Sequence, residues 1–155
     1  MFCAKSAKFY QLGGEANGIQ ALGEDADGTL LVGWKGGIYR FVDGKTEAYP
    51  VSGIRQPFRA HRILRDHNGG LWIATEKEGL VHVHQGRADV HGRSDSLSGD
   101  TVLTFFEDRE GNVRVATADG LDRFRDFTVA TLTVNQGLAH QEVELEAFGW
   151  RRPLG

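Results

Sequence analysis

Two histidines at alternate positions, His82 and His84, are the residues of this chain that first suggest metal chemistry. Side chains at positions i and i+2 of a β-strand point to the same face, and imidazole nitrogen is a common zinc ligand. A structural zinc site needs a third and a fourth ligand, for which only His61 or His91 could be proposed. Two related segments hold arginine at the position of His82, which favours a solvated polar position. We therefore predict no metal site and no cofactor.

The stretch Asp25-Ala26-Asp27-Gly28 places two carboxylates at alternate positions, as in a calcium-binding loop. An EF-hand loop needs a further ligand at its fifth position and a glutamate at its twelfth. Thr29 and Gly36 stand at these two positions. Aspartate also accepts hydrogen bonds from nearby backbone amides, and glycine adopts positive φ without strain. The stretch is therefore better interpreted as a tight hairpin turn.

The sequence contains no pattern typical of an enzyme. It has no nucleophile elbow, no phosphate-binding glycine loop and no metal-binding helix motif. The net charge is −3 and the basic residues are dispersed, which argues against nucleic-acid binding. With one cysteine, Cys3, the chain cannot form an internal disulfide. We predict a non-catalytic protein without a nucleic-acid partner.

The Asp-x-x-Gly turn occurs three times at nearly constant spacing. Its glycines, Gly28, Gly69 and Gly111, lie 41 and 42 residues apart. A short apolar segment follows each turn, and a second glycine opens another apolar run. This spacing indicates a structural repeat. The predicted turn residues are Asp25, Gly28, Asp66, Gly69, Asp108 and Gly111.

Each repeat contains four segments that predict β-strands. In the third repeat they cover residues 102–106, 112–117, 121–124 and 127–132. They are short, rich in β-branched and aromatic residues, and bounded by glycine and acidic turns. No long segment has helical periodicity. A unit of this length with four antiparallel strands is typical of a β-propeller blade, so we predict an all-β chain made of such blades.

The sequence around these turns resembles the two-component regulator propeller repeat, which builds the sensor propellers of hybrid histidine kinases. The resemblance covers about residues 9–148 and is strongest at Arg65-Asp66-x-x-Gly69-x-Leu71-Trp72-Ile73-Ala74-Thr75. It extends to Glu24-Asp25-x-x-Gly28-x-Leu30, to Glu107-Asp108-x-x-Gly111-Asn112 and to the lead-in at residues 96–102. At the position of Trp72, the first and third repeats hold Leu31 and Arg114 and so depart from the family pattern, which usually has tryptophan there. The resemblance implies an extracytoplasmic (periplasmic) sensor domain that binds a ligand, with oligosaccharides as one ligand class.

The repeats divide the chain into about three full blades with partial strands at both ends. The expected boundaries are residues 8–18 for the last strand of a preceding blade, 19–59, 60–101 and 102–142 for three blades, 143–148 for the first strand of a further blade, and 149–155 for a tail. A propeller has four to eight blades, so this chain resembles a piece of a longer receptor. Open blade edges favour pairing, and we predict a homodimer. No apolar run is long enough to span a membrane, and no signal peptide is visible.

Candidate binding residues lie in the loops between second and third strands and between blades. Such loops carry function because a rigid scaffold positions them. The candidates are Trp34, Lys35, Arg59, His61, Glu76, Lys77, Asp100 and Asp119. Trp34 could stack on a sugar ring or pack between blades. A protein–protein scaffold is the alternative function, and a streptogramin-lyase-like propeller enzyme, with His61 as its candidate histidine, is a further one.

Overall fold

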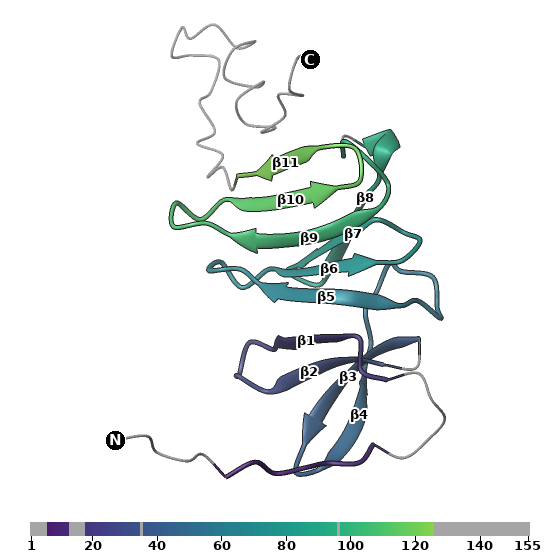
Figure 1. Ribbon diagram of the computed structural model, residues 1–155, viewed down its shortest axis with the longest axis vertical. Coiled ribbons are helices and arrows are strands. Elements are labelled where there is room, and N and C mark those ends of the chain that lie inside the picture. The colour runs from purple at the N-terminus through teal and green to yellow at the C-terminus, as the bar shows by residue number, and fades with distance from the viewer. Residues whose placement is uncertain (1–5, 13–17, 35, 96, 126–155) are drawn as a thin grey trace, which may run out of the picture.

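Three antiparallel β-sheets are stacked along the long axis of the molecule (Figure 1). The computed structural model describes residues 6–12, 18–34, 36–95 and 97–125. Blade 1 contains β1 (Ala21–Glu24), β2 (Leu30–Trp34), β3 (Gly37–Val42) and β4 (Lys45–Tyr49). Blade 2 contains β5 (Ala60–Arg65), β6 (Leu71–Thr75), β7 (Leu80–His84) and β8 (Arg87–His91). Blade 3 contains β9 (Val102–Glu107), β10 (Val113–Thr117) and β11 (Leu121–Phe124), preceded by a short 3-10 helix at Arg93–Asp95. The prediction of an all-β chain of propeller blades is confirmed.

The turn between the first two strands has one geometry in all three blades. Gly28, Gly69 and Gly111 have φ values of 79°, 85° and 78°, which residues with a side chain rarely adopt. The amide of each glycine donates a hydrogen bond of 3.0 Å to the carbonyl oxygen of the aspartate three residues earlier. The repeated Asp-x-x-Gly spacing therefore follows from the geometry of this turn.

The apolar residues form two clusters, one on each side of the central sheet. Leu31 and Ile38 of blade 1 pack with Ile63 and Ile73 of blade 2. On the other side, the second cluster joins blades 2 and 3 and is made of Trp72, Ala74, Leu80, Leu97, Val102, Phe105, Val113 and Val115. Every residue of β6 is buried because blade 2 has a neighbour on both faces.

Two glycines allow the first two strands of blade 1 to approach strand β5 of blade 2 closely. A Cβ atom on Gly23 would lie 2.5 Å from Cγ2 of Ile63, and one on Gly33 would lie 2.8 Å from the carbonyl oxygen of Ala60. Neither distance is compatible with a side chain. The close contact of β5 with β1 therefore depends on Gly23, and its contact with β2 depends on Gly33.

The described part of the chain differs from the predicted repeat at its ends. Residues 8–12 form no strand, and Tyr10 packs edge-on against Phe41, with ring centroids 5.1 Å apart. The predicted strands at 127–132 and 143–148 and the tail at 149–155 lie outside the described residues, as do residues 13–17. Within the described residues, no helix is long and apolar enough to cross a membrane.

Candidate ligand-binding site

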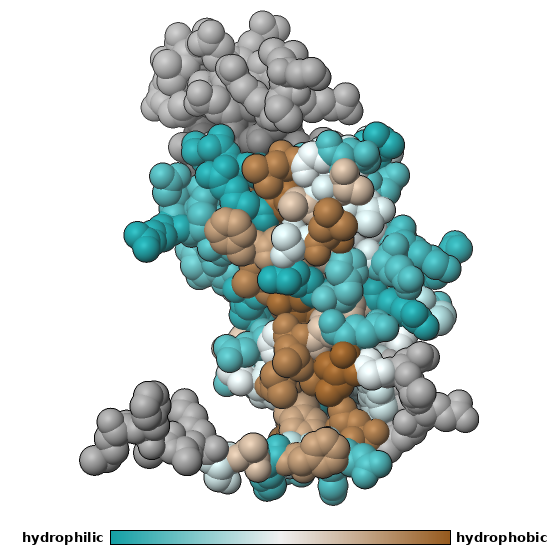
Figure 2. Space-filling view, in the orientation of Figure 1, coloured by the Kyte–Doolittle hydropathy of each residue, from teal (hydrophilic) through white to brown (hydrophobic). Residues whose placement is uncertain are grey.

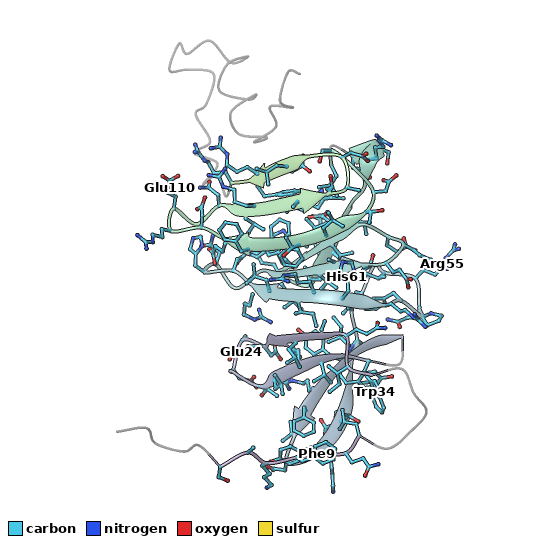
Figure 3. The ribbon with its side chains drawn as sticks, viewed as in Figure 1. Phe9, Glu24, Trp34, Arg55, His61 and Glu110 are labelled. Carbon is cyan, nitrogen blue, oxygen red and sulfur yellow. The ribbon has the colours of Figure 1, made fainter. Side chains whose placement is uncertain are left out.

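The loops lie on two opposite sides of the stacked sheets. Figure 3 shows Glu24 and Glu110 on the side that carries the Asp-x-x-Gly turns, whereas Trp34 and Arg55 lie on the opposite side. The loops between blades and those between second and third strands belong to this opposite side. The predicted binding residues from these loops can therefore be compared on one surface.

A hollow of about 580 Å³ lies on this side between blades 1 and 2. Three predicted residues, Arg59, Glu76 and Lys77, line it together. Its lining consists of Gly18, Gln20, Gly36, Pro57, Phe58, Arg59, Thr75, Glu76, Lys77 and Glu78. The hollow thus combines residues from the loop after β2, the loop before β5 and the loop after β6.

Backbone hydrogen bonds hold these loops together. The Glu76 amide donates to the Arg59 carbonyl oxygen at 3.0 Å, and the Phe58 amide donates to that of Gly36 at 2.9 Å. The buried Thr75 hydroxyl donates to the Gly79 carbonyl oxygen and accepts from the Glu78 amide. The rim of the hollow is therefore fixed by main-chain contacts, so that its charged side chains project from an ordered backbone.

The charged groups at the hollow are accessible. The Nε atom of Arg59 lies 3.9 Å from Oε2 of Glu76, and these side chains are 49% and 58% exposed. An exposed ion pair at this distance contributes little to stability because water screens it. Both groups are therefore available to a ligand. Phe58, 5% exposed, gives the same hollow an apolar wall.

Trp34 ends β2 close to this hollow but does not line it. Its ring packs edge-on against Tyr39, with centroids 5.6 Å apart, and its side chain is half-buried. This contact lies within blade 1. Lys35, the next predicted residue, lies outside the described residues.

His61 lies apart from the hollow, on the innermost strand β5. Its Nε2 atom is 2.8 Å from the Val102 carbonyl oxygen, which links blade 2 to blade 3. It also lines a second hollow of about 580 Å³ between β1 and β5, with Leu22, Arg62 and Ile63 among the neighbouring residues. The structure therefore does not bring His61 together with Glu76 and Lys77.

Asp100 and Asp119 belong to the loops of blade 3. The Asp100 carboxylate accepts a 2.7 Å hydrogen bond from the Arg93 amide, and Asp119 lies 3.6 Å from the Arg93 guanidinium. Arg93 thus connects the loop before blade 3 with the loop after β10. These two predicted residues form a polar group separate from the hollow.

A buried polar cluster beneath these loops was missed by the sequence analysis. The Ser98 hydroxyl lies 2.7 Å from both the Asp122 carboxylate and the Thr117 hydroxyl, and the Ser98 amide also donates to Asp122. Asp122 is only 8% exposed. The repeat could have pointed to this cluster, because Asp122 is acidic where the equivalent residues of the other repeats are Tyr39 and Val81. The cluster anchors the Ser98 loop onto β11.

The expectation that His82 occupies a solvated position is wrong. Its side chain is 16% exposed, and its ring stacks on that of Trp72 with centroids 3.9 Å apart. The Asp66 carboxylate lies 3.5 Å from Nε2 of His82 and accepts a 2.7 Å hydrogen bond from the Trp72 indole. The packing of blade 3 against Trp72 buries this side of blade 2. Among the residues that the structure describes, no three His, Cys, Asp or Glu side chains form a group suited to a metal ion.

Comparison with known proteins identifies the repeat. Residues 56–77 match the family described as the two-component regulator propeller. This chain carries a two-component regulator propeller repeat. The match begins at Gln56, before β5, and ends at Lys77, so it includes the hollow's loops on blade 2. A comparison with curated proteins gave no match.

Solved structures with the same fold include extracellular domains of two-component systems. Two come from B. thetaiotaomicron and are described as extracellular domains of the hybrid two-component systems BT3049 (23% identity, TM-score 0.55) and BT4673 (19%, 0.60). The match to BT3049 covers 68% of this chain and 15% of that structure, and the match to BT4673 covers 76% of this chain and 17% of that structure. PorZ, a surface component of the type-IX secretion system of Porphyromonas gingivalis, has 22% identity and a TM-score of 0.55 over 68% of this chain and 17% of PorZ. The chain therefore spans less than a fifth of each of these structures and shares their fold.

Proposed function

We propose that this chain is a non-catalytic, ligand-binding part of an extracytoplasmic sensor propeller, and that the hollow between blades 1 and 2 binds an oligosaccharide. The observation that carries the proposal is the convergence of Arg59, Glu76 and Lys77 at one hollow. The propeller repeat at residues 56–77 supports the sensor role, as does the fold shared with extracellular domains of two-component systems.

The chemistry of the hollow fits a ligand rich in hydroxyl groups. Arg59 and Lys77 donate hydrogen bonds, whereas the Glu76 carboxylate accepts them. Pro57, an exposed residue of the lining, adds an apolar surface against which the C–H groups of a sugar ring can pack. Concave sites with an apolar wall and a few polar groups are typical of small-ligand binding.

The position of the hollow gives ligand binding a structural consequence. Gln20 and Gly36 come from blade 1, whereas Thr75 and Glu76 come from blade 2. A ligand that contacts both sides stabilises the arrangement of the two blades. At a ligand concentration one hundred times the Kd, this stabilisation amounts to about 2.7 kcal/mol.

Calorimetry and thermal unfolding with a panel of neutral and acidic oligosaccharides test the proposal. We expect saturable heat and a saturable rise in Tm with at least one oligosaccharide. Glu76→Gln and Lys77→Met should each weaken binding about tenfold, which corresponds to the loss of one charged hydrogen bond. Glu47→Gln, on the outer strand β4, is the matched control and should bind as the unaltered chain does.

Two results would contradict the proposal. One is the absence of saturable binding across the panel by a folded chain. The other is binding that Glu76→Gln and Lys77→Met leave unchanged, because the ligand would then occupy a different surface.

A further inference from the structure

Each blade has two faces, and the same structural positions form them in every blade. Leu22, Ile63 and Phe105 are equivalent, since each pairs with the third residue of the following strand: Val32, Ile73 and Val115. In blades 2 and 3 this position faces the preceding blade. Ile63 belongs to the cluster shared with blade 1, and Phe105 belongs to the cluster shared with blade 2. We call this side the preceding face and the opposite side the following face.

Two apolar positions on the preceding face of blade 1 are exposed where their counterparts are buried, whereas Val32 on the same face is 1% exposed. Leu22 is 60% exposed, whereas Ile63 and Phe105 are 6% and 2% exposed. At the neighbouring position, Leu30 is 37% exposed, whereas Leu71 and Val113 are 1% and 3% exposed. Tyr10 contacts Phe41, farther from the inner strand. Blade 1 thus presents an apolar surface of the kind that packs against another blade.

The following face of blade 3 shows the same contrast. Leu121 is 61% exposed, although its equivalents Ile38 and Leu80 are 2% and 0% exposed. Phe106 on this face is 58% exposed, whereas the equivalent Leu64 packs on the cluster between blades 2 and 3. Figure 2 shows apolar surface extending along the molecule over all three sheets. The two ends of the row of blades therefore carry opposite halves of the interface that joins each blade to the next.

Charged residues near the Asp-x-x-Gly turns also connect one blade to the preceding blade. Arg65 of blade 2 reaches back to blade 1, where its guanidinium lies 2.8 Å from the Asp25 carboxylate. Glu107, at the same position in blade 3, reaches back to blade 2 and contacts both the ring and the amide of His67. The last residue of β5 and the last residue of β9 thus each contact the turn of the preceding blade.

The open ends have complementary charges at these same positions. Glu24 is the equivalent of Arg65 and Glu107, and it is exposed at the preceding face of blade 1. Arg109 is the equivalent of His67, and it is exposed in the turn of blade 3. Both turns lie on the same side of the molecule, where Figure 3 labels Glu24 and Glu110. A second copy docked at this face would therefore place Glu24 opposite Arg109.

We propose that two copies of this chain join head to tail, the preceding face of blade 1 in one copy packing on the following face of blade 3 in the other. Two such contacts join the described blades of both copies into one closed arrangement, as neighbouring blades join in a propeller. A heterologous contact of this kind gives a closed ring when its rotation permits. The pairing joins whole sheet faces and leaves the hydrogen-bonding edges of the strands out of the interface.

The C-terminal residues of the same chain compete with a second copy for the following face of blade 3. Counted 41 residues on from blade 3, Glu146 falls at the apolar position of Phe105, and Phe148 falls at the charged position of Glu107. Glu146 therefore offers a charge where the interface is apolar, and Phe148 offers no carboxylate for Arg109. Blade 1 of a second copy offers Leu22 and Glu24 at these positions.

Light scattering after size exclusion, on the full chain at several concentrations, gives the first test. We expect twice the mass of one chain. Leu121→Asp should reduce this mass to that of the monomer while the circular dichroism spectrum stays unchanged, because Leu121 is exposed within one copy. Val42→Asp, at an exposed apolar position at the end of β3, is the control and should leave the dimer intact.

Charge reversal tests the head-to-tail arrangement. Glu24→Arg and Arg109→Glu should each raise the dimer dissociation constant at least about tenfold, because each places like charges at both contacts. A mixture of the two variants should restore the dimer, because every contact in the mixed dimer then joins opposite charges. Glu47→Arg serves as the control for added positive charge.

The proposal is overturned by a monomeric mass at all concentrations, because no second copy would then cover the face of blade 3. It is also overturned by a dimer that is insensitive to Leu121→Asp, or by single charge variants that mixing does not rescue. Higher oligomers that grow with concentration would exclude a closed ring. None of these results bears on oligosaccharide binding, which is measured separately.

Discussion

Asp66→Ala is expected to lower the free energy of unfolding by about 4 kcal/mol. The Asp66 carboxylate is 7% exposed and accepts hydrogen bonds of 2.7 Å from the buried Gly70 amide and from the buried Trp72 indole. A buried donor that loses its acceptor costs about 1–3 kcal/mol, so two such donors together cost about 4 kcal/mol. The Asn68 amide, which is partly buried, loses a third bond.

Urea unfolding followed by circular dichroism at a fixed protein concentration measures this change. Asp27→Ala is the matched control, because Asp27 also accepts a backbone hydrogen bond in its turn but its side chain is 57% exposed. Water can replace the lost acceptor there, so the loss should be much smaller. The order of the two variants therefore tests whether burial decides the cost.

A double-mutant cycle isolates the contribution of the indole. Trp72→Phe removes the Nε1–H donor, so Asp66→Ala should cost about 1.5–3 kcal/mol less in the Trp72→Phe background than in the unaltered chain. The reasoning is refuted if Asp66→Ala costs less than about 1 kcal/mol, or if the coupling between the two positions is below about 0.5 kcal/mol.

Two further predictions concern backbone geometry and pH. Gly79→Ala should destabilise the chain clearly more than Gly86→Ala in urea unfolding. Both glycines have positive φ, but a Cβ on Gly79 would lie 2.5 Å from the His91 carbonyl oxygen, whereas one on Gly86 meets no atom within 4 Å. Equal losses of stability in the two variants would contradict this prediction. Burial lowers the pKa of His91 from its ordinary value of 6.5, against the opposing charges of Asp89 and Asp95. The fold therefore favours neutral His91, so this contribution to stability is complete above pH 6.5 and declines as the pH falls through the lowered pKa. Below pH 6.5 the unaltered chain should lose stability relative to His91→Gln, and parallel pH profiles of the two proteins would exclude the effect.

Turns and strands followed from local sequence because their causes are local. The Asp-x-x-Gly spacing predicted three turns, and each glycine adopts the positive φ for which its missing side chain is suited. The strand predicted at residues 121–124 is β11 as observed, and that at 112–117 differs from β10 by one residue. These features depend on residues that are neighbours in the chain.

Burial at a given repeat position could not be predicted in the same way. Leu121 and Leu80 are equivalent leucines, but within the part of the chain that the structure describes only Leu80 is covered by a further blade. His82 was expected to be solvated, and the packing of blade 3 against Trp72 made that expectation wrong. Whether a sheet face is covered depends on the neighbouring blade.

In the candidate site, too, some features follow from local sequence and others from the packing of the blades. Loop position predicted Arg59, Glu76 and Lys77 as candidate binding residues, and the tertiary structure added that they share a hollow with Gln20 and Gly36 of blade 1. It placed His61 against the Val102 carbonyl oxygen instead. Convergence of side chains from separate blades requires the angle between those blades, which no single repeat encodes.

The sequence by itself determined the repeat, the strand order within each blade and the turn chemistry, because hydrogen bonds and backbone conformations over a few residues decide them. The tertiary structure alone decided which faces are covered, which charges meet and where a hollow forms. Those properties arise from contacts between residues about 40 positions apart, such as Arg65 with Asp25 and His67 with Glu107. They depend on how one blade packs on the next.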